Sequence, residues 1–143
     1  MKAKFLGAML SADGGHDEDT KHRGKAARRI WAKLAPQLPR LGIPNKKLGM
    51  VLRSTVGNCM LYAHECRMVS GQQMHKCKVT FNKAVRGTLH QRIRSMHDDQ
   101  VTMANLYQQL ELRSIESEID WMQQRFIGHT ARRHDESIEK KML

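Results

Sequence analysis

Apolar residues recur in this sequence at the spacing of an α-helix, which turns by about 100° per residue. The first such segment spans residues 17–35 and opens with Asp17-Glu18-Asp19, acids that suit the positive end of a helix. It stops before Pro36. One side of this segment carries the apolar residues Ala27, Ile30, Trp31 and Leu34. The pattern therefore predicts an amphipathic helix that needs other apolar faces to pack against.

The same periodicity continues through the rest of the chain. A second helix is predicted from Asn45 to about Val69, with the apolar face Leu48, Val51, Leu52, Thr55, Cys59, Tyr62, Ala63 and Cys66. A third follows Ser70-Gly71, with the stripe Met74, Cys77, Phe81, Val85, Leu89 and Met96. A short helix at 103–110 precedes one that is capped by Ser114 and stopped by Gly128. We expect a mainly α fold with four or five amphipathic helices.

The N-terminal segment has a different pattern. Residues 3–10 are apolar but too short for a helix, and they predict a buried strand closed by a turn at residues 12–15. The helices are thus expected to follow a short N-terminal strand or hairpin. A strand needs partners, and the rest of the sequence offers few, so we expect this chain to be part of a larger protein.

Positive charge is concentrated in the first two thirds of the 143 residues. The net charge is +11 with a pI of about 10.0, and residues 1–50, 51–100 and 101–143 contribute +7, +5 and −1. A basic balance of this size is typical of proteins that bind a polyanion. We therefore expect any nucleic-acid surface to lie within residues 1–100.

Two of the predicted helices carry a face with cations and no acids. These faces hold the candidate nucleic-acid contacts Lys21, Lys25, Arg28, Arg29 and Lys33 in the first helix, and Lys76, Lys83, Arg86 and Arg94 in the third. A solvated basic face is the simpler interpretation of each. The absence of acids among so many cations favours surfaces that face phosphates.

Cysteine and histidine residues suggest a competing interpretation, a zinc site in a basic protein. Cys59, His64, Cys66, His75 and Cys77 have the right chemistry. On a helix, however, Cys59 and Cys66 share the apolar face while His64 points away from it. Buried thiols without a metal fit these positions better. An odd number of cysteines also favours a reducing compartment.

Three stretches occur in the order found in the reverse transcriptases of non-LTR (LINE-type) retrotransposons. They are Phe5-Leu6-Gly7, Leu61-Tyr62-Ala63-His64-Glu65, and Gly128-His129 followed by Arg132. The chain resembles the part of such a polymerase that follows the active site. The resemblance implies an end-of-palm strand and turn at 1–15, a basic helical thumb at 16–97, and a post-thumb helical extension with a charged tail at 98–143.

The resemblance also implies roles for individual residues. Phe5, Leu6 and Gly7 match the hairpin that supports the primer end, a primer-grip-like element. The thumb helices lie along the template–primer duplex in that family. Gly128, His129 and Arg132 match a family signature whose role the sequence does not reveal.

Polymerase activity is not expected of this chain on its own. The family's catalytic aspartates lie in a short motif upstream of the Phe-Leu-Gly strand, and four residues precede Phe5. Asp98-Asp99 lies in a polar loop and does not match that motif, so we expect no catalytic residues here. Mg²⁺ is implied only for a full-length polymerase, and no metal or other cofactor is expected in this part. The implied partners are an RNA–DNA or DNA duplex and the missing upstream polymerase portion.

Two interpretations from other classes remain: a free-standing basic helical RNA- or DNA-binding protein, and a zinc-stabilised helical module. No apolar run approaches the ~20 residues of a membrane span. No secretory signal pattern is present at the N-terminus either. These features predict an intracellular protein, nuclear or cytoplasmic, that is not secreted and does not associate with a membrane.

Overall fold

The protein is mainly α-helical, as the periodicity predicts. The computed structural model describes residues 2–5, 8–11, 17–62, 64 and 69–132. Its elements are, in order, β1 (Lys2–Phe5), β2 (Ala8–Ser11), α1 (Asp17–Leu34), the 3₁₀ turn η1 (Leu38–Leu41), α2 (Asn45–Leu52), the π-helical turn η2 (Arg53–Gly57), α3 (Asn58–Leu61), α4 (Gly71–Thr88), α5 (Ile93–Asp98), α6 (Met103–Gln109) and α7 (Ile115–Ala131). None of the described helices is long and apolar enough to cross a membrane.

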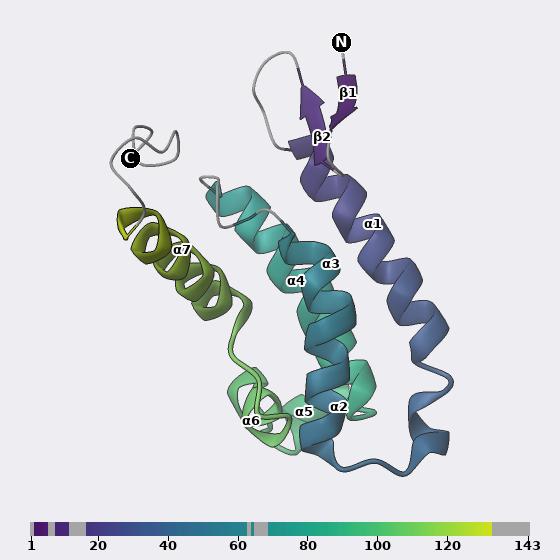
Figure 1. Ribbon diagram of the computed structural model, residues 1–143. Helices are drawn as coiled ribbons and strands as arrows, with labels where there is room; N and C mark the ends of the chain where they lie inside the picture. Colours follow the sequence, from purple (N-terminus) through teal and green to yellow (C-terminus); the bar gives the residue numbers. More distant parts are fainter. Residues whose placement is uncertain (1, 6–7, 12–16, 63, 65–68, 133–143) are drawn as a thin grey trace.

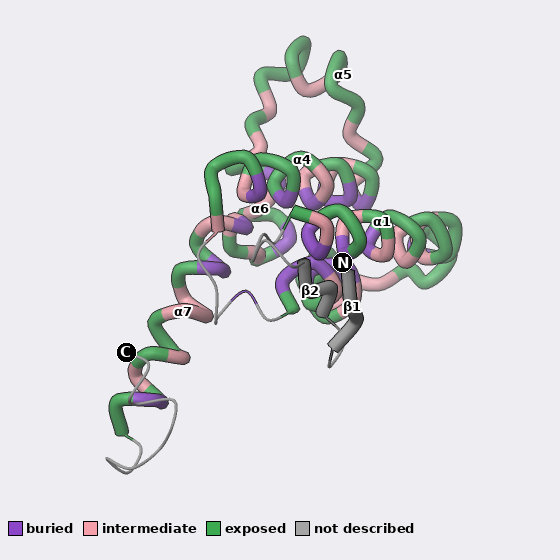
Figure 2. Tube along the Cα trace, turned by 90° about the horizontal axis from the view of Figure 1, so that it is seen from above, coloured by how far each residue is buried: buried purple, intermediate pink, exposed green. Residues whose placement is uncertain are grey.

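Helix α4 lies at the centre of the arrangement. It contacts α1 on one side, the α2–η2 segment on another, and α6 and α7 on a third. Figure 1 shows α1 and α7 on opposite sides of it, with α5 and α6 at its C-terminal end. In Figure 2, α7 extends away from the other helices. The buried core formed between these helices contains Ala27, Leu52, Val56, Met60, Leu61, Cys77, Phe81, Ala84, Val85, Leu106, Leu110, Ile115 and Ile119.

The N-terminal segment forms an antiparallel hairpin. Strand β1 pairs with β2 in a register that places Lys2 opposite Ser11 and Phe5 opposite Ala8. The hairpin contacts α1 through β2. The expectation of one continuous strand over residues 3–10 is therefore wrong, because residues 2–5 and 8–11 form two antiparallel strands. The turn predicted at residues 12–15 lies outside the described residues.

The second predicted helix differs from the sequence pattern in phase and in length. The turn η2 inserts one extra residue relative to an α-helix, so every residue after it is rotated by roughly 100°. The inward stripe therefore continues from Leu52 to Val56 and Met60, instead of through the predicted Thr55 and Cys59. The helix also ends at Leu61 rather than Val69, since Tyr62 has extended backbone angles.

Helix termini explain the other differences. Helices α4, α5 and α6 each end in a Schellman motif, with paired bonds such as Gln91 N–H to Arg86 carbonyl (2.8 Å). The residue after each C-cap has a positive φ although none is glycine: His90, Gln100 and Glu111. The predicted third helix is therefore divided into α4 and α5. Gly128, the predicted stop, lies inside α7 instead.

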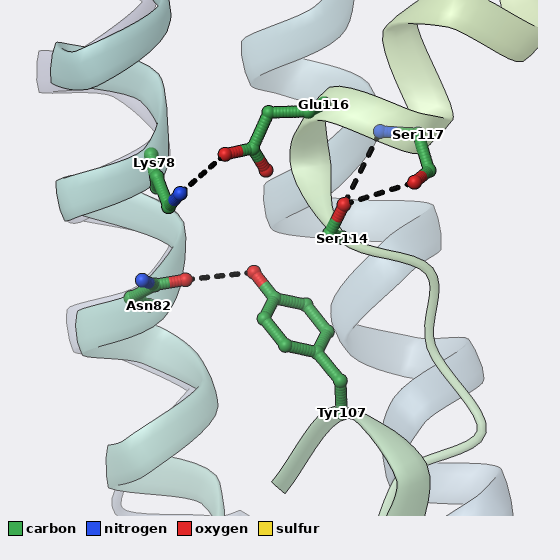
Figure 3. Close-up of polar contacts among 6 residues, drawn as sticks. All are labelled: Lys78, Asn82, Tyr107, Ser114, Glu116 and Ser117. Carbon is green, nitrogen blue, oxygen red and sulfur yellow. Dashed lines mark hydrogen bonds and ion pairs between the residues drawn. The ribbon is translucent and has the colours of Figure 1, made fainter. Parts of the chain in front are cut away.

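Polar contacts fix α6 and α7 against α4 (Figure 3). The Tyr107 hydroxyl donates to Asn82 Oδ1 at 2.7 Å, and burial raises the pKa of this tyrosine. Lys78 pairs with Glu116 at 2.5 Å, close to Ser114, which caps α7 by accepting from the Ser117 N–H. Two cross-helix contacts therefore join neighbouring turns of α4 to α6 and α7.

Replacing Gly49 with Ala should lower the free energy of unfolding by about 3 kcal/mol. A Cβ at this position in α2 would lie 2.0 Å from the Leu110 carbonyl oxygen, so the backbone of one element has to move. Urea unfolding followed by circular dichroism measures the change. Gly71→Ala is the matched control, since a Cβ there meets nothing within 4 Å. Equal stability of the two variants would contradict the close approach of α2 to the end of α6.

Glu116 should contribute a small, pH-dependent part of the stability. Partial burial alone would raise its pKa, but the hydrogen bonds, chiefly from Lys78, hold the pKa below the ordinary 4.5. A lowered pKa stabilises the fold above about pH 4.5, and that contribution is lost as the pH falls further. Glu116→Gln should therefore cost less than about 1 kcal/mol at pH 7 and flatten the acid limb of the stability profile. An unchanged acid limb would show that the pair contributes nothing.

Candidate nucleic-acid interface

Helices α1 and α4 lie side by side, and their inward stripes determine which residues face the gap between them. Ala27 on α1 and Ala84 on α4 are buried at this contact. Residues that flank the inward stripe of each helix then lie along the edges of this contact. Parts of the two predicted basic faces therefore border the same surface.

A furrow runs along the α1–α4 contact. It consists of two adjoining depressions, of about 130 and 420 Å³, which share Arg28 and Thr80. Five of the predicted phosphate contacts line it: Lys21, Lys25 and Arg28 from α1, and Lys76 and Lys83 from α4. We refer to these five residues and the depressions between them as the α1–α4 furrow.

Trp31 lies at one end of the furrow, where its ring packs closely against Gly87 of α4. A Cβ on Gly87 of α4 would come within 2.6 Å of the indole Cζ2, so the absence of a side chain at Gly87 makes room for the ring. Trp31 is half-buried and lines the larger depression together with Val79, which is 52% exposed. The furrow thus has an apolar floor and a cationic rim.

The rim of the furrow has little negative charge to balance it. Lys21 pairs with Glu18 at 3.0 Å, and that hydrogen bond raises the pKa of the lysine. Within the described part of the chain, no carboxylate forms an ion pair with Lys25, Arg28, Lys76 or Lys83. Anions that approach the furrow therefore meet several uncompensated cations at once.

The remaining predicted contacts lie elsewhere. Arg29 and Lys33 are exposed on α1 and line neither depression of the furrow. Arg86 is half-buried, with its Nη1 4.0 Å from the Met103 sulfur at α6. Arg94 belongs to α5, because α4 ends at Thr88. The predicted second ridge therefore does not exist as one helix face.

Other expected site residues are only partly described. Phe5 ends β1, and Leu6 and Gly7 lie outside the described residues. Gly128 and His129 lie in the last turns of α7, and Arg132 caps its end. An Arg132 Nη1 lies 3.5 Å from the position a Cβ would take at Gly128, so the arginine folds back along the helix.

No group of three or more metal-ligating side chains comes together within the described residues. Cys77 is buried in the core as predicted, whereas Cys59 is only half-buried. Burial raises the pKa of the Cys59 thiol, an effect that the nearby positive charge of Arg23 opposes. His64 is buried instead of outward-facing, because the helix that would have turned it outward ends three residues earlier. Cys66 lies outside the described residues.

Sequence patterns gave no indication of a buried ion pair in α1. Arg23 Nε donates to Asp19 Oδ2 at 2.6 Å, and both side chains are almost fully buried. The Arg23 guanidinium also stacks 4.5 Å from the centre of the Tyr62 ring. The spacing of these two residues, one helical turn, is compatible with a pair, but such pairs are usually exposed and acids at a helix start are usually solvated.

Comparison of the chain with protein-family models, curated proteins and solved structures finds no match. The similarity to reverse transcriptases therefore rests on the motifs alone and remains a prediction.

Replacing Arg23 with Gln should destabilise the fold by about 3–5 kcal/mol, because it breaks the buried ion pair with Asp19. Lys25→Gln is the matched control on the same helix, and it should change the stability by no more than about 0.5 kcal/mol. The free energies of unfolding of the two variants, measured by urea unfolding, show the difference. Similar stabilities for both variants would mean that Arg23 acts as a surface cation like its neighbours.

Proposed function

We propose that this protein binds a nucleic-acid duplex through the α1–α4 furrow. The observation that carries the proposal is the convergence of Lys25, Arg28, Lys76 and Lys83, from two helices far apart in the sequence, without paired carboxylates among the described residues. Like charges held together in this way repel each other. A polyanion relieves that repulsion, which favours binding.

The expected contacts are with phosphates and carry no base sequence. Lys21 and Arg28 are seven residues apart, as are Lys76 and Lys83, which places each pair about 10 Å apart along its helix. Measured along the axis of a duplex, that distance corresponds to roughly three phosphate steps of one strand. Lysine and arginine side chains on exposed helix edges set the position of a backbone, whereas sequence is read by groups that enter a groove. Binding should therefore depend little on sequence.

We further propose that this binding is that of a thumb in a LINE-type reverse transcriptase. Its support is the motif order in the sequence together with a basic helical surface after an N-terminal hairpin. In that role the duplex is an RNA–DNA template–primer. The Mg²⁺ and its carboxylates belong to the upstream polymerase portion. A free-standing basic nucleic-acid-binding protein is the alternative, and the same furrow would serve it. Only the thumb hypothesis requires the upstream portion to bind this chain and gain affinity for a primer duplex.

Removing two furrow cations should weaken duplex binding and reduce its salt dependence. Each phosphate contact contributes about −0.9 to the slope of log affinity against log salt on B-form DNA. The double variant Lys25→Gln/Lys83→Gln should therefore flatten the slope by up to about two units, equally for different sequences. Fluorescence anisotropy of a labelled duplex over a salt series gives the measurement.

The charge-matched control is Arg40→Gln/Lys47→Gln, two exposed cations on η1 and α2 that do not line the furrow. The pair Arg29→Gln/Lys33→Gln tests the outer side of α1 and should have a smaller effect than the furrow pair. If the control pair flattens the slope as much as the furrow pair, binding is a property of net charge and the furrow is not the site.

A further inference from the structure

The C-terminal half of α7 carries aromatic and cationic side chains on one surface. A depression of about 380 Å³ is lined there by Trp121, Met122, Arg125, Phe126, His129 and Arg132. Its size is that of a site for a small organic ring system rather than for an ion. We refer to these six residues as the α7 depression. It includes His129 and Arg132, two of the signature residues that the sequence left without a role.

Arginines surround the indole at one end of this depression. The guanidinium carbons of Arg125, Arg113 and Arg53 lie 4.7, 5.0 and 5.7 Å from the centre of the Trp121 ring. Arg53 is also paired with Glu118. A guanidinium that stacks on an aromatic ring keeps its N–H edge available, and that edge matches the geometry of a phosphate. Arg113 and Arg125 are thus pre-oriented donors.

Within the described residues, the second half of α7 is more positive than the composition of its segment indicates. Residues 101–143 sum to −1, but the acids of α7 all lie in its first half. Glu116 and Glu118 pair with Lys78 and Arg53 from other helices. The second half of α7 keeps Arg125 and His129, and Arg132 follows at its end. An anion at the α7 depression therefore meets no carboxylate from that half of the helix.

We propose that the α7 depression binds single-stranded nucleic acid, with bases stacked on Phe126 and the exposed part of Trp121 and with phosphates on Arg113, Arg125 and Arg132. Stacking requires exposed base faces, which a single strand offers and a duplex does not. The combination of aromatic floor and arginine rim fits such a strand better than an acidic peptide, which has no planar bases to stack.

This second site goes beyond the duplex binding proposed for the furrow and does not depend on it. Helix α7 packs on the side of α4 opposite to α1, so the two surfaces are separate (Figure 1). A strand that leaves a duplex bound in the furrow would find a second contact on α7. The near-neutral net charge of residues 101–143 gave no indication of this surface.

The two tryptophans of the chain allow the two sites to be observed separately. In Trp31→Phe the only indole is Trp121, and in Trp121→Phe it is Trp31 of the furrow. We expect an oligodeoxythymidine of about 12 nucleotides to quench the fluorescence of Trp31→Phe, with a duplex of equal charge quenching it much less. Stronger quenching of Trp121 by the duplex would overturn the proposal.

Side-chain substitutions test the mode of binding in the Trp31→Phe background. Phe126→Ala should weaken oligodeoxythymidine binding about tenfold, and Arg125→Gln/Arg132→Gln should flatten its salt slope by about 1.4 units. The matched control is Ile127→Ala, the next residue on α7, which is 52% exposed and does not line the depression. Circular dichroism checks that each variant is folded.

Two further probes separate the alternatives. A base-free deoxyribose-phosphate strand of the same length should bind at least about tenfold more weakly than oligodeoxythymidine. Equal binding of that strand, or of a polyglutamate peptide, would overturn the proposal by showing a general anion surface. Loss of strand binding on Phe126→Ala with unchanged duplex binding would support it, and a failure here leaves the furrow result intact.

Discussion

The packing of α4 determines where both proposed binding surfaces of this protein lie. Its buried stripe, Cys77, Phe81, Ala84 and Val85, allows only one rotation of the helix about its axis. That rotation turns Lys76 and Lys83 toward α1 and turns Lys78 and Asn82 toward α7 and α6. One side of α4 thus completes the furrow, while the other holds the helix that carries the α7 depression. Both surfaces therefore depend on the hydrophobic packing of α4 against its neighbours.

Much of this architecture follows from the sequence, and the predictions that were wrong have identifiable physical causes. The inward positions of Ala27, Ile30 and Trp31 on α1, the stripe of α4 and the cap at Ser114 are confirmed, since regular α-helices repeat at a fixed angle and their caps are local. The phase of the middle segment could not be predicted, because the extra residue in η2 changes that angle. Helix ends were missed for a related reason: three of them close at residues other than glycine.

The candidate surfaces show the same division between local and long-range information. Lys25 and Arg28, or Lys76 and Lys83, share a helix face by their spacing, so each half of the furrow was predictable. That the halves meet depends on the docking of α1 on α4, which no local pattern encodes. The cluster around Trp121 could not be predicted from local patterns either, because Arg53 lies 68 residues before the indole that it approaches.

The left-handed residues that end α4, α5 and α6 have an implication for engineering. A side chain at His90, Gln100 or Glu111 forces Cβ against the following carbonyl, at a cost of roughly 1 kcal/mol each. Glycine would adopt the same angles without that cost. All three residues are exposed, and none lines the furrow or the α7 depression. Glycine substitutions at these three turns should therefore raise the thermal stability of the fold while leaving both surfaces unchanged.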